Sequence, residues 1–142
     1  MKPAPFEYAA PTTLDEAIEL LASNPEAKVL AGGQSLMPLL ALRLARPELV
    51  VDLNRIAGLS GIEATSNPGD AGPSVRFGAL VRQRELVTQP HHPLIAEAAS
   101  RVAHAAIRSR GTFGGSLAHA DSAAELPVVS LSIGARIEAV GP

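Results

Sequence analysis

The sequence predicts an α+β fold with two subdomains, and three observations support this prediction. Helical spacing of apolar residues alternates with short apolar runs bounded by glycine and proline, which are typical of strands. Residues 28–53 have the pattern of a strand–helix–strand unit, and residues 61–79 have that of an antiparallel hairpin. Residues 54–58 separate the two patterns. We therefore expect a small α/β subdomain at residues 1–55 and a second α+β subdomain at residues 56–142.

The first subdomain opens with a proline-rich stretch, residues 1–11, which we expect to be extended. Thr13 and Glu16 then match a capping box, in which the Thr13 hydroxyl accepts from the Glu16 N–H and the Glu16 carboxylate reaches back. An apolar stripe with helical spacing follows and stops at residues 23–25, so a helix is predicted between these points.

A compact strand–helix–strand unit comes next. Apolar runs at residues 28–31 and 48–53 predict two buried strands. Pro38 suits the first turn of a helix that joins them, because its missing N–H costs nothing there. We expect the two strands to be parallel, with a right-handed crossover.

The second subdomain is predicted to combine a hairpin with several helices. The hairpin strands are residues 61–65 and 74–79, with turn-forming residues 66–73 between them. Helices are expected at residues 80–87, at 93–103, and from a second capping box, Ser122 to Glu125, through Ile133 to a stop at Gly134. Residues 135–140 alternate in polarity and predict a half-buried strand whose partner strand is missing from the sequence.

The composition narrows the classes of function. The 142 residues carry a formal net charge of −2 and include three Phe, one Tyr and no Trp. Binding of single-stranded nucleic acid uses aromatic platforms in a basic groove, so we expect no nucleic acid partner. Because the chain has no cysteine, it can itself hold no disulfide, thiolate nucleophile or iron–sulfur cluster.

Metal binding and membrane insertion are also not expected. The four histidines share no ligand spacing with carboxylates on one helix face, so no metal site is predicted. The sequence shows neither a signal peptide nor an apolar run long enough for a membrane span. We expect a cytoplasmic protein without a membrane span.

Two glycine-rich segments form the candidate binding site. Residues 31–36 (AGGQSL), the first glycine segment, follow an apolar run, and residues 111–116 (GTFGGS) are the second glycine segment. Glycine lets a ligand approach main-chain N–H groups, and a diphosphate can be gripped from two sides. Neither segment matches the P-loop or the G-x-G-x-x-G signature. A tight turn followed by a helix cap is the structural alternative for residues 111–116.

Two carboxylates behind the second glycine segment suit the hydroxyls of a ribose. They belong to Asp121 and Glu125, for which the structural alternatives are a helix N-cap and a capping-box partner, respectively. Asp52 and Arg55 are expected to make hydrogen bonds at a strand end or in a loop. No acid–base constellation is evident, so no catalytic residue is predicted.

The two glycine segments together give the sequence a family resemblance. Residues 30–36 and 111–127, supported by residues 6–8, 13–17 and 51–56, resemble the FAD-binding medium subunit of the molybdenum hydroxylases. That family includes aerobic carbon monoxide dehydrogenase and the flavin domain of xanthine dehydrogenase. The resemblance implies a two-subdomain FAD-binding fold of the PCMH (vanillyl-alcohol-oxidase-like) type. Both subdomains would bind FAD non-covalently, and the second would be truncated.

The resemblance also implies which residues contact FAD. Residues of the first glycine segment and its preceding strand would bind the diphosphate, residues of the second would close over it, and an acidic residue would hold the adenosine ribose. The implied residues are Leu30, Ala31, Gly32, Gly33, Gln34, Ser35, Leu36, Thr112, Gly114, Gly115, Ser116, Asp121 and Glu125.

By the same resemblance the protein relays electrons. It would take them from the iron–sulfur centres of a [2Fe–2S] small subunit, in a complex with a molybdopterin large subunit, and pass them through FAD to an external acceptor. Two alternatives remain. One is a different flavin reductase of the same general fold, and the other is a truncated, non-catalytic fragment that acts in assembly.

Overall fold

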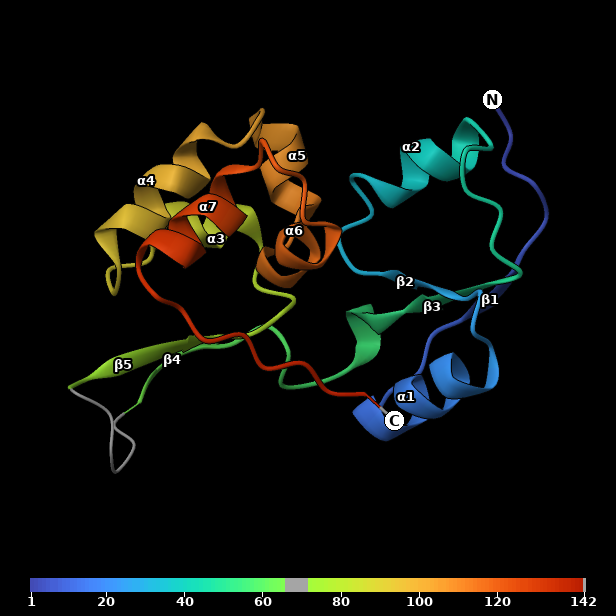
Figure 1. Cartoon of the computed structure of the whole chain (residues 1–142), viewed down its shortest axis with the longest axis horizontal. Helices are drawn as coiled ribbons and strands as arrows, with labels where there is room; N and C mark the ends of the chain where they lie inside the picture. The colour runs from blue at the N-terminus through green and yellow to red at the C-terminus, as the bar shows by residue number, and fades with distance from the viewer. Residues whose placement is uncertain (66–71, 142) are drawn as a thin grey trace. The chain divides into compact units, whose positions relative to one another are not determined.

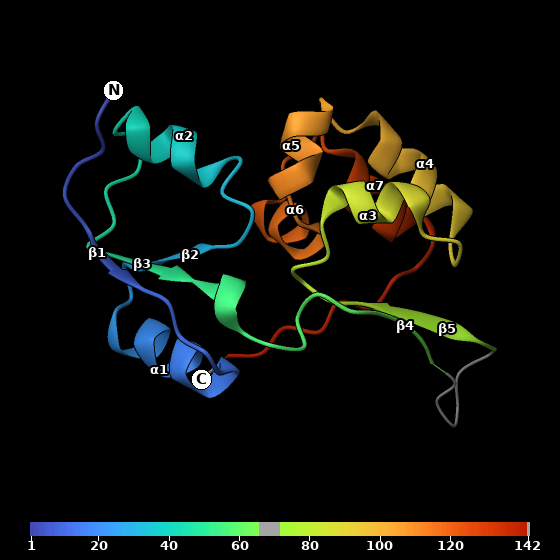
Figure 2. The ribbon, with the colours of Figure 1, turned by 180° about the vertical axis from the view of Figure 1, so that it is seen from behind.

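A computed structural model of the chain describes residues 1–65 and 72–141, and Figures 1 and 2 show it from opposite sides. The chain forms two compact units. The first contains Met1–Ala57 and the C-terminal residues from Ile137 onward, and the second contains Gly58–Arg136. The elements are helices and short strands in both units, so the predicted mixture of helix and sheet is confirmed.

The first unit is built on a three-stranded parallel sheet with the order β1-β3-β2. Val50 and Val51 of the central strand are almost fully buried, as predicted for residues 48–53. The prediction of a second buried strand is wrong, because β2 lies at the sheet edge and leaves Val29 43% exposed. The strands are β1 (Glu7–Ala9), β2 (Lys28–Leu30) and β3 (Leu49–Asp52).

Two helices connect these strands. α1 (Leu14–Ser23) links β1 to β2, and α2 (Leu36–Ala41), with Pro38 in its first turn, links β2 to β3. The chain thus moves across the sheet in opposite directions, and two right-handed crossovers then require helices on opposite faces. Figures 1 and 2 show α1 and α2 on opposite faces of the sheet.

The start of α1 confirms the predicted cap. The Thr13 hydroxyl accepts a hydrogen bond from the Glu16 N–H at 3.2 Å. The reciprocal bond differs by one residue, because the Glu16 carboxylate accepts from the N–H of Thr12 at 3.0 Å. The helix ends at Ser23, where the sequence predicted its end.

In its described residues, the second unit joins a hairpin to five helices. β4 (Ile62–Thr65) and β5 (Ser74–Phe77) are antiparallel, with Ile62 opposite Phe77, as the sequence predicted; of the turn-forming residues, 66–71 lie outside the described residues. The helices are α3 (Gln83–Thr88), α4 (Pro93–Arg101), α5 (Ala105–Arg110), α6 (Phe113–His119) and α7 (Glu125–Ser132).

An apolar cluster forms the core of this unit where α3, α4, α6 and α7 meet. The ring of Phe113 contacts that of Phe77 edge-on, with 5.5 Å between centroids. The buried members of the cluster are Val81, Leu86, Ile95, Ala99, Phe113, Leu126 and Val129.

The predicted capping box before α7 is wrong, although its predicted end is right. The helix begins at Glu125 with Ala124 as N-cap, and Ser122 lies in a turn where Asp121 Oδ1 accepts from the N–H of Ala123 at 2.9 Å. The helix closes at Gly134, whose φ of +65° favours glycine.

The strand predicted at residues 135–140 is also wrong. These residues belong to no strand in the described part of the chain, and Ile137 is 65% exposed. Alternation of polarity produces a strand only where a neighbouring strand supplies hydrogen bonds, and no such neighbour is present among the described residues. No helix in the described ranges is long and apolar enough to cross a bilayer.

Candidate functional site

The first glycine segment leaves the sheet at the carboxyl end of β2. Ligands of parallel α/β sheets bind at this end, where the strands release their loops. Gly33 has a φ of +73°, and a Cβ there would lie 3.0 Å from Leu30 Cδ1 and 3.1 Å from Met37 Cγ. The backbone conformation therefore favours glycine at this turn, and a Cβ would also require the Leu30 and Met37 side chains to shift slightly.

Most carbonyl groups of this segment are already used as acceptors. Two of them are held by side-chain amides and two by the first turns of α2. The bonds join Ala31 O to Asn54 Nδ2 (2.8 Å), Gly32 O to Gln34 Nε2 (3.1 Å), Gly33 O to Met37 N (3.0 Å) and Ser35 O to Leu39 N (3.3 Å).

From Gly32 onward, the main-chain N–H groups of this segment, unlike most of its carbonyl groups, are not used in hydrogen bonds within the described residues. Within the described part of the chain, none of the main-chain N–H groups from Gly32 to Leu36 donates a hydrogen bond. A loop with occupied acceptors and spare donors is electropositive, which suits an anion. The segment therefore fits a diphosphate.

The second glycine segment is not an open loop, because it forms the capped first turn of α6, as in the structural alternative of a tight turn followed by a helix cap. The Thr112 side chain is the N-cap and is only 2% exposed. The N–H groups of this turn all donate within the chain, which leaves none for a ligand. They join Phe113 N to Val81 O (2.9 Å), Gly114 N to Ala79 O (2.9 Å), Gly115 N to Thr112 Oγ1 (3.1 Å) and Ser116 N to Thr112 O (3.2 Å).

Close packing within the unit explains one glycine of this segment, Gly114, and leaves little room at a second, Gly111. A Cβ on Gly114 would lie 2.7 Å from Ala79 Cα, and a Cβ on Gly111 would collide with the Gln83 side chain. The Ala79 backbone cannot give way, so Gly114 needs glycine irrespective of a ligand, whereas the end of the flexible Gln83 side chain can move aside for a Cβ on Gly111.

Polar side chains near this segment remain available. Within the described ranges, the Ser116 hydroxyl and the Glu125 carboxylate have no hydrogen-bond partner, and both residues are partly exposed. Asp121 is exposed, and one of its carboxylate oxygens is used in the turn before α7. Ser116 and Glu125 therefore keep their full capacity for polar contacts with a ligand.

A polar cluster of Tyr8, Asp52 and Asn54 lies beside the first glycine segment, and the sequence predicts only part of it. Asp52 was expected to make strand-end hydrogen bonds, and it accepts them from the Tyr8 hydroxyl and from the N–H of Asn54 at 2.9 Å. The Asn54 side chain also donates to Asp52 and reaches Ala31 O. No sequence signal identifies this contact, because Asn54 and Ala31 are 23 residues apart.

The same cluster perturbs the tyrosine. The hydrogen bond to the Asp52 carboxylate raises the pKa of Tyr8, desolvation and the negative charge of Asp52 add to this effect, and Arg55 opposes it. The protonated phenol is therefore the form that the cluster stabilises.

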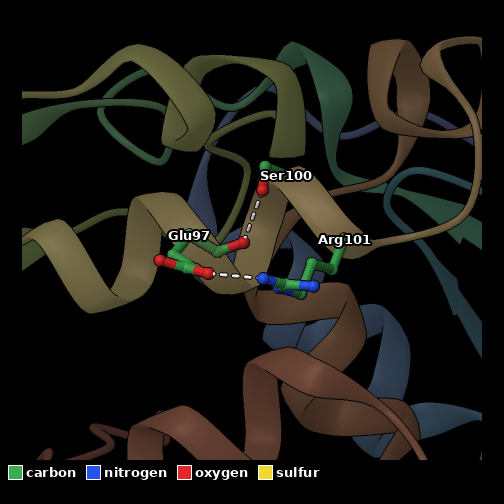
Figure 3. Close-up of polar contacts among 3 residues, drawn as sticks. All are labelled: Glu97, Ser100 and Arg101. Carbon is green, nitrogen blue, oxygen red and sulfur yellow. Dashed lines mark hydrogen bonds and ion pairs between the residues drawn. The ribbon is translucent and has the colours of Figure 1, made fainter.

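The ion pair on α4 is a surface contact and not part of the site. Figure 3 shows Arg101 Nη2 against Glu97 Oε1, 2.6 Å apart, and the Ser100 hydroxyl donating to Glu97 O at 2.7 Å. The hydrogen bond to Glu97 raises the pKa of Arg101. Both side chains are more than 60% exposed, so the pair contributes little to stability. Among residues 1–65 and 72–141, no group of three His, Cys, Asp or Glu side chains could hold a metal ion.

Known proteins resemble this chain along nearly its whole length. It is 46% identical over 98% of its residues to the 6-hydroxypseudooxynicotine dehydrogenase complex subunit alpha of Paenarthrobacter nicotinovorans, covering 47% of that protein. It is also 40% identical to the carbon monoxide dehydrogenase medium chain of Hydrogenophaga pseudoflava. That match covers all of this chain and 49% of the relative. The chain thus spans about half the length of the curated relatives that it matches.

Solved structures of similar proteins match the fold of this chain. A structure of carbon monoxide dehydrogenase from Hydrogenophaga pseudoflava matches 94% of this chain with a TM-score of 0.85 and 40% identity, over 46% of its own chain. Quinoline 2-oxidoreductase from Pseudomonas putida matches 91% with a TM-score of 0.81 and 43% identity, over 45% of its chain. The predicted FAD-binding fold is thereby confirmed.

A family model that matches nearly the whole chain identifies the family. Residues 4–142 match the family model described as the FAD binding domain in molybdopterin dehydrogenase. FAD is accordingly the cofactor that the family binds, and the first glycine segment has the polarity that its diphosphate needs. The chain belongs to the family of FAD-binding domains of molybdopterin dehydrogenases.

Proposed function

We propose that this chain is the N-terminal FAD-binding part of the flavoprotein subunit of a molybdenum-containing hydroxylase. In the cytoplasm, the complete complex would pass electrons from a [2Fe–2S] small subunit, through FAD, to an external acceptor, with a molybdopterin large subunit as second partner. The relatives named as medium chain or complex subunit of dehydrogenases support this proposal. The observation that carries it is the set of unused N–H groups from Gly32 to Leu36 beside occupied carbonyls.

The first glycine segment would hold the diphosphate through these N–H groups. Leu30 and Ala31 lead the chain into the turn, and Gly33 gives the turn its conformation. The Gln34 amide is committed to Gly32 O, so it stabilises the loop. The exposed Ser35 side chain has no hydrogen-bond partner among the residues that the structure describes, so it can bind a phosphate oxygen.

The second glycine segment would contribute shape and side chains in place of N–H groups. Thr112, Gly114 and Gly115 build the tight first turn of α6, from which Ser116 presents its hydroxyl. Glu125 would take the ribose hydroxyls, with Asp121 as the second candidate. When bound, FAD supplies the electron-transfer chemistry, and the protein binds and orients it.

Inorganic pyrophosphate tests the assignment of the diphosphate. We expect millimolar pyrophosphate to shift the amide resonances of residues 32–36 in two-dimensional NMR spectra, because their N–H groups are unused. The amides of residues 113–116 should stay in place, since each already donates within the chain. Sodium chloride at matched ionic strength is the control. Shifts at residues 113–116 with none at 32–36 would contradict the proposed division of roles.

Titration with FAD then separates the alternatives. Quenching of flavin fluorescence by the chain supports the cofactor proposal, whereas no quenching and no pyrophosphate shift would leave the assembly fragment as the better interpretation. Co-purification of iron–sulfur and molybdenum subunits from the native host separates a complex component from a stand-alone flavin reductase, which would retain neither.

A further inference from the structure

We infer that Asn54 is a positioning residue for the diphosphate loop, and that Asp52 and Tyr8 hold Asn54 in place. Because this role concerns FAD binding by the first glycine segment, it rests on the proposed function. Asn54 lies in the 3₁₀ turn η1 (Leu53–Arg55), directly after the central strand β3.

The Asn54 side chain links the end of β3 to the start of the glycine segment. Its Nδ2 donates to Ala31 O at 2.8 Å and also to Asp52 Oδ1. An amide nitrogen carries two hydrogens, so both are committed in this arrangement. The contact spans 23 residues and fixes Asn54 against the loop of the neighbouring strand.

The Asp52 carboxylate is in turn fixed from two sides. Its Oδ1 accepts from the N–H of Asn54 at 2.9 Å, and its Oδ2 accepts from the Tyr8 hydroxyl of β1. Tyr8, Asp52 and Asn54 thus form a chain of hydrogen bonds from β1 through the end of β3 to the loop after β2. All three strands of the sheet contribute to the position of Ala31 O.

The orientation of one peptide plane explains why this matters for an anion. In a trans peptide the carbonyl of Ala31 and the N–H of Gly32 point in opposite directions. Holding the carbonyl on Asn54 therefore directs the N–H of Gly32 to the other side. Gln34 does the same for the next peptide, since it holds Gly32 O and so directs the N–H of Gly33.

Glycine makes this constraint necessary. Glycine residues pass readily between backbone conformations, so the peptides around Gly32 and Gly33 can flip. A flipped peptide presents a carbonyl oxygen to the diphosphate in place of an N–H, which is repulsive. The flip breaks the hydrogen bond from Asn54 Nδ2 to Ala31 O, so this bond favours the orientation that presents the N–H of Gly32.

Substitution of Asn54 tests this role in the intact chain. We expect Asn54→Ala to weaken FAD binding roughly tenfold, as measured by quenching of flavin fluorescence, because one loop-orienting hydrogen bond is lost. Asn54→Asp should weaken it further, since a carboxylate cannot donate to Ala31 O and repels Asp52.

Asn24 offers a matched control in the same unit. Its Nδ2 donates to Leu20 O, also at 2.8 Å, at the end of α1. Asn24→Ala therefore removes the same kind of bond and should lower the thermal midpoint without changing FAD affinity. A merely structural role for Asn54 predicts the same outcome for both variants, and equal FAD affinities of Asn54→Ala and the unmodified chain would overturn the inference.

A second measurement is independent of FAD. In Asn54→Ala, ¹⁵N relaxation should show exchange broadening at Gly32 and Gly33, caused by peptide flips, whereas Asn24→Ala should leave these signals unchanged. Unaltered relaxation in Asn54→Ala overturns the positioning role. Failure of the unmodified chain to bind FAD, with the broadening present, would instead count against the proposed function alone.

Discussion

At the scale of single residues, one carboxylate organises the carboxyl edge of the first unit. Asp52 receives hydrogen bonds from the Tyr8 hydroxyl, the Asn54 main chain and the Asn54 side chain. A hydrogen bond to a charged acceptor is shorter and stronger than one between neutral groups. Because Tyr8 must donate its proton to this carboxylate, the cluster has a titration that can be followed directly.

Tyr8 can be titrated without interference, because it is the only tyrosine and the chain has no tryptophan. We expect its ultraviolet titration midpoint to lie above the ordinary value of 10.0, since ionisation would break the bond to Asp52 and place two negative charges together. Asp52→Ala should bring the midpoint down towards the ordinary value. Asp15→Asn is the control, because Asp15 is not among the groups that shift this pKa.

The raised pKa of Tyr8 determines how its contribution to folding stability changes with pH. The contribution of the Tyr8 bond is fully present below the pKa of the unfolded state and is lost as pH rises through the higher pKa of the folded state. In alkaline solution the unmodified chain should therefore lose more stability than Tyr8→Phe. Parallel alkaline profiles for the two proteins would contradict a bond between Tyr8 and Asp52.

Residue-level prediction from the sequence worked where the partners are local. Hydrogen bonding of Asp52 at a strand end could be predicted, because Asn54 is only two residues away. The contact from Asn54 to Ala31 could not, because it depends on the parallel pairing of β2 with β3. The same limit applies to Gly114, whose packing partner is Ala79.

At the scale of elements, the second glycine segment is explained by the cap of α6. The Thr112 hydroxyl accepts from the N–H of Gly115 at 3.1 Å, and the main chain around it pairs with residues 79–83. The three glycines suggested a loop from their propensity. Burial of Phe113 in the core and the close approach of Gly114 to Ala79 override that propensity and stabilise a helical turn.

Removal of this cap should destabilise the chain measurably. We expect Thr112→Val to lower the free energy of unfolding by about 1–2 kcal/mol, because the partly buried N–H of Gly115 loses its acceptor on the buried Thr112 side chain. Thr112→Ser keeps the hydroxyl and should retain most of the stability. Urea denaturation compares the variants, and a Thr112→Val protein as stable as the unmodified chain would show that the cap is unimportant.

Of two sequence segments with the same capping-box pattern, one caps its helix and the other does not, and the neighbouring residue explains the difference. Thr13 caps α1 as predicted, whereas Ser122 does not cap α7. The Asp121 carboxylate accepts from Ala123, and its carbonyl accepts from Ala124 N at 3.0 Å, so these residues form a turn. The motif alone does not include the residue before it, which is the one that competes for the N–H groups here.

At the scale of the whole molecule, each compact unit buries its own apolar residues. Val50, Val51 and Leu40 are almost fully buried in the first unit, and the seven-residue cluster around Leu86 lies wholly within the second. The composition of the sequence could predict that the chain contains enough apolar residues for a core. It could not predict that the residues from Ile137 onward belong with the first unit, because that grouping depends on long-range contacts.

Separate cores predict separate responses to a core mutation. Leu86→Ala should cost about 2–5 kcal/mol, because Leu86 is fully buried among α3, α4 and α7. Hydrogen exchange followed by mass spectrometry should then show faster exchange in peptides from residues 58–136, with unchanged exchange in β1, β2 and β3. Val51→Ala, at an equally buried position in β3, should give the reverse pattern. If either substitution accelerates exchange in both units alike, the chain unfolds as one cooperative body, and the two cores are energetically one.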